Sequence, residues 1–399
     1  MSDVFLVFLR LGLTSFGGPV AHLGYFRTEF VARRRWLDEA AYADVVALCQ
    51  FLPGPASSQV AVTLGMQRAG LAGGLLAWLG FAGPSALAMI AFAYGVGWAG
   101  AVEAAPWLHG LKLVAVAVVA QAVAAMARNL CPDRPRQTLG VSAALLALAL
   151  PGVAGQLAAI ALGAVAGLYL PREPVAAAPT AAVAPVERQV APAVAVASLV
   201  AFVVLLFGLP ALAEAGIGGH ALALVEEFYR AGALVFGGVH VVLPLLQQVV
   251  VPPGWIDNSL FLAGYGAAQA VPGPLFSFAA FLGAVMNPEP NGWAGGLLCL
   301  AAIYLPSFLL LVGVLPFWEG LRRRAPVRAA LRGVNAAVVG LLLAALYTPV
   351  WTSAVGTPAA FGLVCLAFLA LVAWRLPPWG VVLGGAAAAS ALGWAGVPV

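Results

Sequence analysis

The sequence predicts an all-α polytopic membrane protein with two inverted-topology repeats. Three observations lead to this fold class: the composition, an internal repeat and the distribution of arginine. The chain has 399 residues, of which 63% are hydrophobic and 9% charged. Soluble domains carry roughly 25% charged residues. This chain has too few charged residues to cover its surface in water, so we expect lipid to surround most of it. Apolar runs such as residues 190–213 and 297–317 have the length that crosses the hydrocarbon core as a helix.

The composition also argues against other classes of protein. The net charge is +4, but the basic residues are scattered over many loops, so we expect no nucleic-acid-binding surface. The sequence has no HExxH, Walker A, GxSxG or CxxC pattern, and we therefore expect no enzymatic activity, no metal site and no cofactor. Residues 1–10 lack the basic start of a cleavable signal peptide. The cysteines mostly fall in apolar runs, where packing is their expected role: Cys49, Cys131, Cys299 and Cys365.

An internal repeat relates the two halves of the chain. Phe8-Leu9-Arg10-Leu11-Gly12 and then Phe16-Gly17-Gly18 correspond to Phe228-Tyr229-Arg230-Ala231-Gly232 and Phe236-Gly237-Gly238. Gln50-Phe51-Leu52-Pro53-Gly54-Pro55 corresponds to Gln269-Ala270-Val271-Pro272-Gly273-Pro274, and Pro84-Ser85 to Pro306-Ser307. Chance similarity between apolar segments would not keep these Gln, Pro, Gly and Ser residues in order. We predict a first repeat at 1–170, an Ala/Pro-rich linker at 171–192, an extra transmembrane helix at 193–213 and a second repeat at 222–399.

The arginines predict which loops face the cytoplasm. Loops 98–107, 214–220, 246–258, 287–292 and 351–357 contain no arginine, and the positive-inside rule places them outside. The same rule places the arginine-bearing loops in the cytoplasm: Arg27, Arg33 to Arg35, Arg68, Arg128 to Arg136, Arg172, Arg188, Arg322 to Arg332 and Arg375.

This assignment implies broken, re-entrant segments. Residues 33–35 and Arg68 share a side, although the apolar segment with the first Pro-Gly-Pro motif lies between them. That segment would therefore enter and leave by one face, and the same reasoning applies to the Phe-Gly-Gly segments. The first-half hairpins would open to the cytoplasm and the second-half hairpins to the outside, with the helix at 193–213 inverting the second half. The alternative is that every apolar segment crosses fully, which would place Arg68 or the Arg128 cluster outside.

The paired breaks predict a binding site for an anion. Each Pro-Gly-Pro removes two backbone donors and breaks a helix, and half-helix N-termini present N–H groups and positive dipole ends to a common centre. The alternatives are that each motif is only a kink in a spanning helix, and that the serines and threonines bond to their own helices. The candidate substrate-binding residues are Thr14, Ser15, Gly17, Gly18, Gln50, Pro53, Gly54, Pro55, Ser57, Ser58, Gln59, Gly237, Gly238, Gln269, Pro272, Gly273, Pro274 and Ser277.

Ionisable residues in apolar segments are candidates for a functional role. For charge compensation of an anion we consider Arg10, Lys112 and Arg230. The alternatives are that Lys112 extends to the interface near His109, and that the arginines pair with Asp3 or with Glu226 and Glu227. For proton coupling we consider four residues near the breaks: His22, Glu29, Asp44 and His240. The alternative is a packing role, which is common for a lone histidine in an apolar segment.

The motifs resemble the chromate ion transporter family over nearly the whole chain. In the first half these are Thr14-Ser15-Phe16-Gly17-Gly18-Pro19 with His22, Arg35-Trp36-Leu37, and Gln50 to Pro55 with Gln59. In the second half they are Phe236-Gly237-Gly238, Val242-Leu243-Pro244-Leu245, Gly254-Trp255, and Gln269 to Phe276. Two positions depart from the repeat symmetry: Val239 lies opposite Pro19, and Asn335 opposite Lys112.

The resemblance implies the long, two-domain form of the family, which is found in prokaryotic inner membranes. It implies halves of opposite orientation and a multi-pass secondary transporter that exports chromate, with proton coupling and alternating access. Sulfate or another tetrahedral oxyanion is the alternative substrate, and a passive anion channel is the alternative mechanism. The expected partners are a chromate or sulfate dianion, protons and the lipid bilayer, with a homodimer as a possible assembly.

Overall fold

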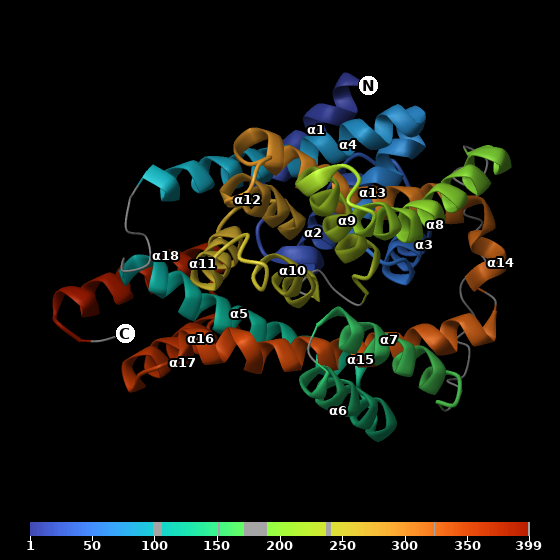
Figure 1. Cartoon of the computed structure of the whole chain (residues 1–399). Coiled ribbons are helices and arrows are strands. Elements are labelled where there is room, and N and C mark those ends of the chain that lie inside the picture. The colour runs from blue at the N-terminus through green and yellow to red at the C-terminus, as the bar shows by residue number, and fades with distance from the viewer. Residues whose placement is uncertain (99–105, 151, 171–189, 237–240, 323, 398–399) are drawn as a thin grey trace.

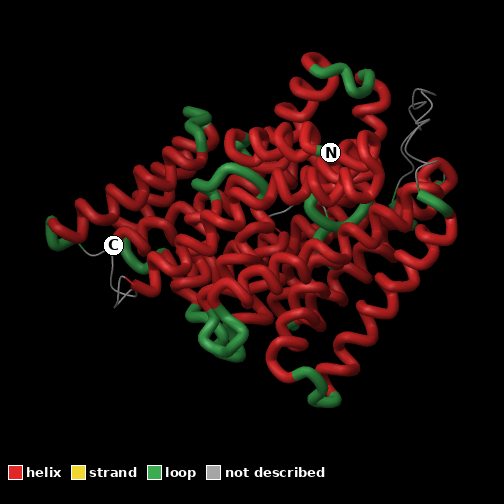
Figure 2. The backbone as a smooth tube through the Cα atoms, turned by 90° about the horizontal axis from the view of Figure 1, so that it is seen from above, coloured by secondary structure: helices red, strands yellow, loops and turns green. Residues whose placement is uncertain are grey.

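The computed structural model describes residues 1–98, 106–150, 152–170, 190–236, 241–322 and 324–397. Within these ranges the chain is helical and has no strand (Figures 1 and 2). Five helical stretches are long and apolar enough to cross a membrane: Ala56–Val96, Pro106–Leu130, Pro192–Glu214, Gly292–Leu321 and Ala325–Ala354. The protein is therefore an all-α polytopic membrane protein, as the composition predicts.

The helices of the second half occur along the chain in the same order as their counterparts in the first half. The first half contains α1 (Ser2–Thr14), α2 (Gly18–Phe26) with a π-helical turn (Arg27–Arg33), α3 (Glu39–Phe51), α4 (Ala56–Trp98), α5 (Pro106–Leu130), α6 (Arg134–Ala149) and α7 (Val153–Gly167). The second half contains their counterparts α9 (Gly219–Ala233), α10 (Val242–Val250), α11 (Asn258–Ala268), α12 (Phe278–Val285), α13 (Gly292–Val314), α15 (Ala325–Ala345), α17 (Pro358–Val372) and α18 (Pro378–Trp394). The helix α8 (Pro192–Glu214) stands between the two halves, and most of the predicted linker, residues 171–189, lies outside the described ranges.

Helix α4 consists of two segments that fold back on each other. The backbone leaves the helical conformation at Ala69 and Gly70. Across this bend the chain packs closely, because a methyl group added to Gly65 would lie 2.4 Å from the carbonyl oxygen of Gly73. We call residues 56–68 the short segment and residues 71–98 the long segment of α4. Helices α12 and α13 form the corresponding hairpin in the second half.

The broken segments of the first half return to the side on which they begin. Trp36 lies between the π-helical turn and α3, and the Arg68 guanidinium carbon lies 4.9 Å from the centre of its ring. The chain therefore comes back to its starting side after α3 and the short segment of α4. Asp3 at the start of α1 pairs with Arg34 after α2, with 3.1 Å between Oδ1 and Nη1, so this segment also returns. We call the region around these contacts the first mouth.

The second half shows equivalent contacts around Trp255. The amide of Asn287, after α12, donates a hydrogen bond of 3.0 Å to the carbonyl of Trp255, before α11. The ring of His220, at the start of α9, lies 4.6 Å from the ring of Trp255, centroid to centroid. We call this region the second mouth. These are the contacts expected of re-entrant segments rather than of segments that each cross fully.

The long segment of α4 connects the two mouths. It begins after Gly70, beside the first mouth, and its Tyr94 hydroxyl lies 2.6 Å from the position of a methyl group added to Gly292, beside the second mouth. A helix rises about 36 Å between residues 70 and 94, which exceeds the ~30 Å of a bilayer core. The two mouths therefore lie at opposite ends of a helix that is long enough to cross the membrane.

Several loops without arginine meet at the end of the second mouth. The rings of Phe92 and Trp107 lie 6.4 Å apart, which brings the end of α4 to the start of α5. Lys112, in the second turn of α5, donates a 3.3 Å hydrogen bond to the Ser259 hydroxyl at the start of α11. This grouping follows the distribution of arginine in the sequence.

The two halves exchange helices. Helix α5 packs against α17 and α18 of the second half, whereas its counterpart α15 packs against α6 and α7 of the first half. The backbones come close at small residues, since a methyl group on Gly110 would lie 2.5 Å from the Gly385 carbonyl oxygen and one on Gly340 would lie 2.0 Å from that of Gly140. Close approach at small residues is typical of helix packing in membranes. In Figure 1 the exchanged helices lie below, and α1 to α4 with α8, α9, α12 and α13 lie above.

Cysteine labelling in oriented vesicles tests this topology. In a Cys365→Ser background, Ala32→Cys and Leu71→Cys should react with an impermeant maleimide from the same side, because α3 and the short segment of α4 form one re-entrant hairpin. Pro253→Cys should react only from the opposite side. Labelling of Ala32→Cys and Leu71→Cys from opposite sides would show that the Pro-Gly-Pro segment crosses the membrane.

Candidate functional site

The re-entrant segments end in two Pro-Gly-Pro corners whose conformation requires glycine. We call residues 53–55 the first corner and residues 272–274 the second corner. Gly54 has φ of 117° and Gly273 has φ of 105°, a region that side chains rarely adopt. The prolines on either side have no N–H group, so each corner has a single backbone donor.

In each corner, this single N–H group forms a hydrogen bond with the other half of the protein. The Gly54 amide donates a 2.7 Å hydrogen bond to the carbonyl of Val235, and the Gly273 amide donates a 2.9 Å bond to the carbonyl of Ser15. Ser15 and Val235 are equivalent residues, each directly before a Phe-Gly-Gly motif. Each corner therefore touches the other half's Phe-Gly-Gly break. We call the region around these two bonds the junction.

Serine side chains surround both corners in a reciprocal arrangement. A methyl group on Gly54 would lie 2.7 Å from the Oγ of Ser307 on α13, and one on Gly273 would lie 3.0 Å from the Oγ of Ser85 on α4. The Ser277 hydroxyl donates a 2.8 Å hydrogen bond to Ser85. These three serines thus bring the turn before α12 and the long helices α4 and α13 to the corners.

Two further polar contacts join the halves at the start of α4. The Gln59 amide nitrogen donates hydrogen bonds to the carbonyl of Pro53, at 2.8 Å, and to the Ser307 hydroxyl, at 2.9 Å. The Ser58 hydroxyl lies 3.4 Å from the hydroxyl of Tyr304. Ser58, Gln59 and Tyr304 are buried, so these contacts belong to the interior of the protein.

His22 also contacts this set of residues. Its Nε2 lies 3.2 Å from the carbonyl of Ser15, and its Nδ1 lies 3.3 Å from the Ser57 hydroxyl. A neutral imidazole fits both partners, because Nε2–H donates to the carbonyl and Nδ1 accepts from the hydroxyl. His22 is 1% exposed. The repeat places Val242 at the equivalent position, so the second half lacks this group.

The junction can bind an oxyanion through neutral donors. Its described side chains are hydroxyls, one amide and one imidazole, and the start of a helix adds N–H groups without a partner inside the helix. The buried Ser15 hydroxyl has no hydrogen-bond partner among the described residues and can donate to an anion. Gln59 Oε1 also lacks a partner there, but it only accepts, and the Gln59 amide nitrogen already donates to Pro53 and Ser307. The amides of Gly54 and Gly273 are already bonded across the halves, so the corners do not offer these N–H groups to a ligand in this conformation. The donors that remain lie in the first turns after the corners.

Other candidate residues lie away from these contacts or outside the described ranges. Thr14 is exposed, and its hydroxyl donates to the carbonyl of Arg10 within α1. Gln50 is exposed and Gln269 is half-buried. Gly17 and Gly18 have positive φ and begin α2 next to Ser15. The remaining ones, Gly237, Gly238 and His240, lie outside the residues that the structure describes.

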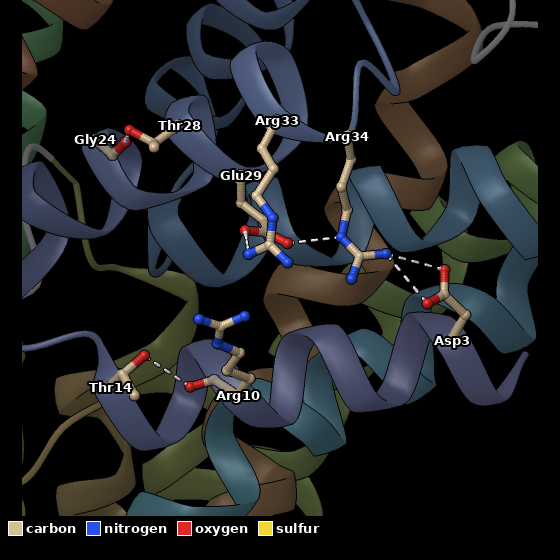
Figure 3. Close-up of polar contacts among 8 residues, drawn as sticks. All are labelled: Asp3, Arg10, Thr14, Gly24, Thr28, Glu29, Arg33 and Arg34. Atoms are coloured by element: carbon tan, nitrogen blue, oxygen red, sulfur yellow. Dashed lines mark hydrogen bonds and ion pairs between the residues drawn. The ribbon is translucent and has the colours of Figure 1, made fainter.

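Two of the charged candidates, Arg230 and Glu29, form ion pairs. Arg230 forms ion pairs with Glu226, at 2.7 Å, and with Glu227. Glu29 pairs with Arg33 at 3.0 Å and Arg34 at 2.6 Å (Figure 3). Lys112 is buried near the second mouth, and Asp44 is half-buried on α3. Arg10 is exposed on α1.

Four residues at the junction are not among the candidates predicted from the sequence: Ser85, Val235, Tyr304 and Ser307. Ser85 and Ser307 could have been predicted from the sequence, because both follow a proline and occupy equivalent positions in the two repeats. No sequence pattern indicates Val235 or Tyr304. Val235 contributes its backbone carbonyl, and Tyr304 contributes a hydroxyl group from within an apolar helix. Within the described ranges, no group of three His, Cys, Asp or Glu side chains could hold a metal ion.

Two repeats with broken helices that meet in the interior define a class of proteins, the transporters built from internal repeats. Comparison with known proteins narrows the class. The model of the chromate transporter family matches residues 2–168 and 222–390, and the chain belongs to this family.

Relatives of similar length support the assignment. The chain is 31% identical to a chromate transport protein of Pseudomonas aeruginosa, over 85% of this chain and 79% of the relative. It is 28% identical to a chromate transport protein of Cupriavidus metallidurans, over 92% and 88% of the two chains. It is 25% identical to an uncharacterized transporter of Methanocaldococcus jannaschii, over 86% and 82%. No solved structure matches the chain.

Replacing Gly54 by alanine tests the geometry of the corner. The positive φ and the contact with Ser307 should together destabilise the folded protein by roughly 1–3 kcal/mol, measured as a lower midpoint of thermal unfolding in detergent. Gly83→Ala is the matched control, because a methyl group there would meet nothing within 4 Å. An unfolding midpoint that is unchanged in Gly54→Ala would contradict the corner described here.

Proposed function

We propose that this protein exports chromate from the cytoplasm across the inner membrane, as a proton-coupled secondary transporter that works by alternating access. The reciprocal contact between each corner and the opposite half is the observation that carries this proposal. The substrate class is supported by the named relatives and by the donors at the junction. The orientation in the membrane is supported by the arginine-bearing loops, which the positive-inside rule assigns to the cytoplasm.

Alternating access requires a barrier that can form on either side of one site. The contacts of Gly54 with Val235 and of Gly273 with Ser15 join the tips of hairpins that open at opposite ends. Moving one half relative to the other would break one of these bonds and open a path to one mouth, while the other bond keeps the second path closed. The near symmetry of the two bonds would make both states similar in energy.

The chemistry of the junction suits a tetrahedral dianion. Hydroxyl groups and N–H groups at a helix start can each donate to an oxygen of the anion, and no charged side chain has to be buried for this. Chromate and sulfate share shape and charge, so the contacts do not by themselves separate them. Sulfate or another tetrahedral oxyanion is therefore the alternative substrate, and a passive anion channel the alternative mechanism.

His22 is the candidate for proton coupling. It contacts Ser15, whose carbonyl also accepts the amide of Gly273 across the halves. Protonation of Nδ1 would turn this atom from an acceptor into a donor and change its contact with Ser57. A proton on His22 would thus alter the hydrogen bonds next to one of the two contacts that close the junction.

Transport by purified protein in liposomes tests the proposal. Radiolabelled chromate should accumulate when a pH gradient is imposed and should not accumulate without one. Excess unlabelled sulfate should compete if the site recognises tetrahedral dianions in general. Flux that only dissipates a chromate gradient, whatever the pH gradient, would identify a channel, and absence of any flux would contradict the proposal.

Substituting glutamine for His22 tests the coupling. Glutamine retains a donor and an acceptor but does not titrate, so the variant should carry chromate down its own gradient and lose the stimulation by a pH gradient. His220→Gln is the control, since that histidine lies at the second mouth, away from the junction. Stimulation of the His22→Gln protein by the same gradient as the wild type would assign coupling to another residue.

A further inference from the structure

Arg10 and Arg230 are equivalent residues of the two repeats, but their surroundings differ. Arg230 lies on α9 one turn before the break, and its side chain is 23% exposed. Its Nη1 lies 2.7 Å from Glu226 Oε1, and its Nη2 pairs with Glu227. Two carboxyl groups thus face one guanidinium, and no positive charge is left over at this level of the second half.

Arg10 has no such partners. Both oxygens of Glu29, the carboxylate nearest to it in Figure 3, are taken by Arg33 and Arg34, and Arg34 also holds Asp3. Among the residues that the structure describes, Arg10 forms no ion pair. Three arginines therefore share two carboxylates at the first mouth. This leaves an excess of positive charge among these five residues, whereas Arg230 with Glu226 and Glu227 has none.

The position of Arg10 connects this charge with the junction. Arg10 lies one helical turn before Thr14, and the next residue, Ser15, bonds to Gly273 at the junction. The distance along the axis of α1 from Arg10 to Ser15 is about 7 Å. An exposed arginine at this depth is stable only where water reaches it, because a charge facing lipid is costly. Water that reaches Arg10 from the first mouth would come within this distance of the junction.

We propose that Arg10 captures the oxyanion at the first mouth. Arg230 does not bind the anion in this way, because Glu226 and Glu227 neutralise its charge. This inference rests on the proposed function and adds that the two sides bind substrate unequally. A cation in a hydrated funnel raises the local concentration of an anion and speeds its association. Substrate loads from the first mouth at lower concentration than from the second, which favours one direction of transport.

Initial rates in oriented vesicles test this inequality. The half-saturating chromate concentration is measured from each face for the wild type, Arg10→Gln, Arg10→Lys and the double variant Glu226→Gln/Glu227→Gln. Arg375→Gln is the control, because it removes an exposed positive charge on the turn between α17 and α18. Each measurement is made at low and at high salt and in vesicles with and without anionic lipid.

Arg10→Gln should raise the half-saturating concentration from the first mouth roughly three- to tenfold at low salt, the effect of one charge a few ångströms from a dianion in a hydrated site. The difference should shrink at high salt, and the value from the second mouth should stay constant. Arg10→Lys should retain the wild-type value. The double glutamine variant should lower the value from the second mouth, because it exposes the charge of Arg230.

An equal change from both faces, no change in Arg10→Gln, or no effect of the double glutamine variant would each overturn the inference. An effect confined to vesicles with anionic lipid would overturn it too, since Arg10 would then hold a lipid phosphate. These results differ from failure of the proposed function, in which the wild-type protein itself would carry no chromate.

Discussion

Two backbone hydrogen bonds between the halves hold the interior of this protein together, one from Gly54 to Val235 and one from Gly273 to Ser15. A broken helix inside a membrane exposes backbone polar groups, and lipid cannot satisfy them. Here each half supplies the partner that the other half lacks. The prolines on either side leave the glycine amide as the only donor of each corner, so the corner has one way to be satisfied. Removing either half would leave the other with an unsatisfied break.

The remaining architecture follows from this constraint. Because the corners meet each other's Phe-Gly-Gly breaks, the hairpins that carry them extend to opposite ends of α4, with mouths at Trp36 and Trp255. The exchange of α17 and α18 with α6 and α7 further joins the halves. The structure therefore combines strong connection at the periphery with a polar, nearly symmetric contact at the centre. A nearly symmetric central contact is suited to two states of similar energy, which a transporter requires.

The sequence predicted the order of segments well because the relevant signals are local. The Pro-Gly-Pro motifs mark breaks, and the positive-inside rule assigns the arginines to one side of a membrane irrespective of packing. It did not reveal the partners of the corners, since Val235 acts through a carbonyl group that every residue has. The ion pairs of Glu29 with Arg33 and Arg34 also depend on the π-helical turn, which no pattern in the sequence marks. Symmetry suggested equal roles for Arg10 and Arg230, and only three-dimensional neighbours distinguish them.

The location of a bound chromate ion tests the central claim most directly, and anomalous diffraction at the chromium edge from crystals grown with chromate would provide it. The account predicts one chromium peak at the junction, within reach of the hydroxyls of Ser57 and Ser277 and of the first turn of α4. A peak elsewhere, for example beside Lys112 and Ser259 near the second mouth, with no peak at the junction, would contradict the account.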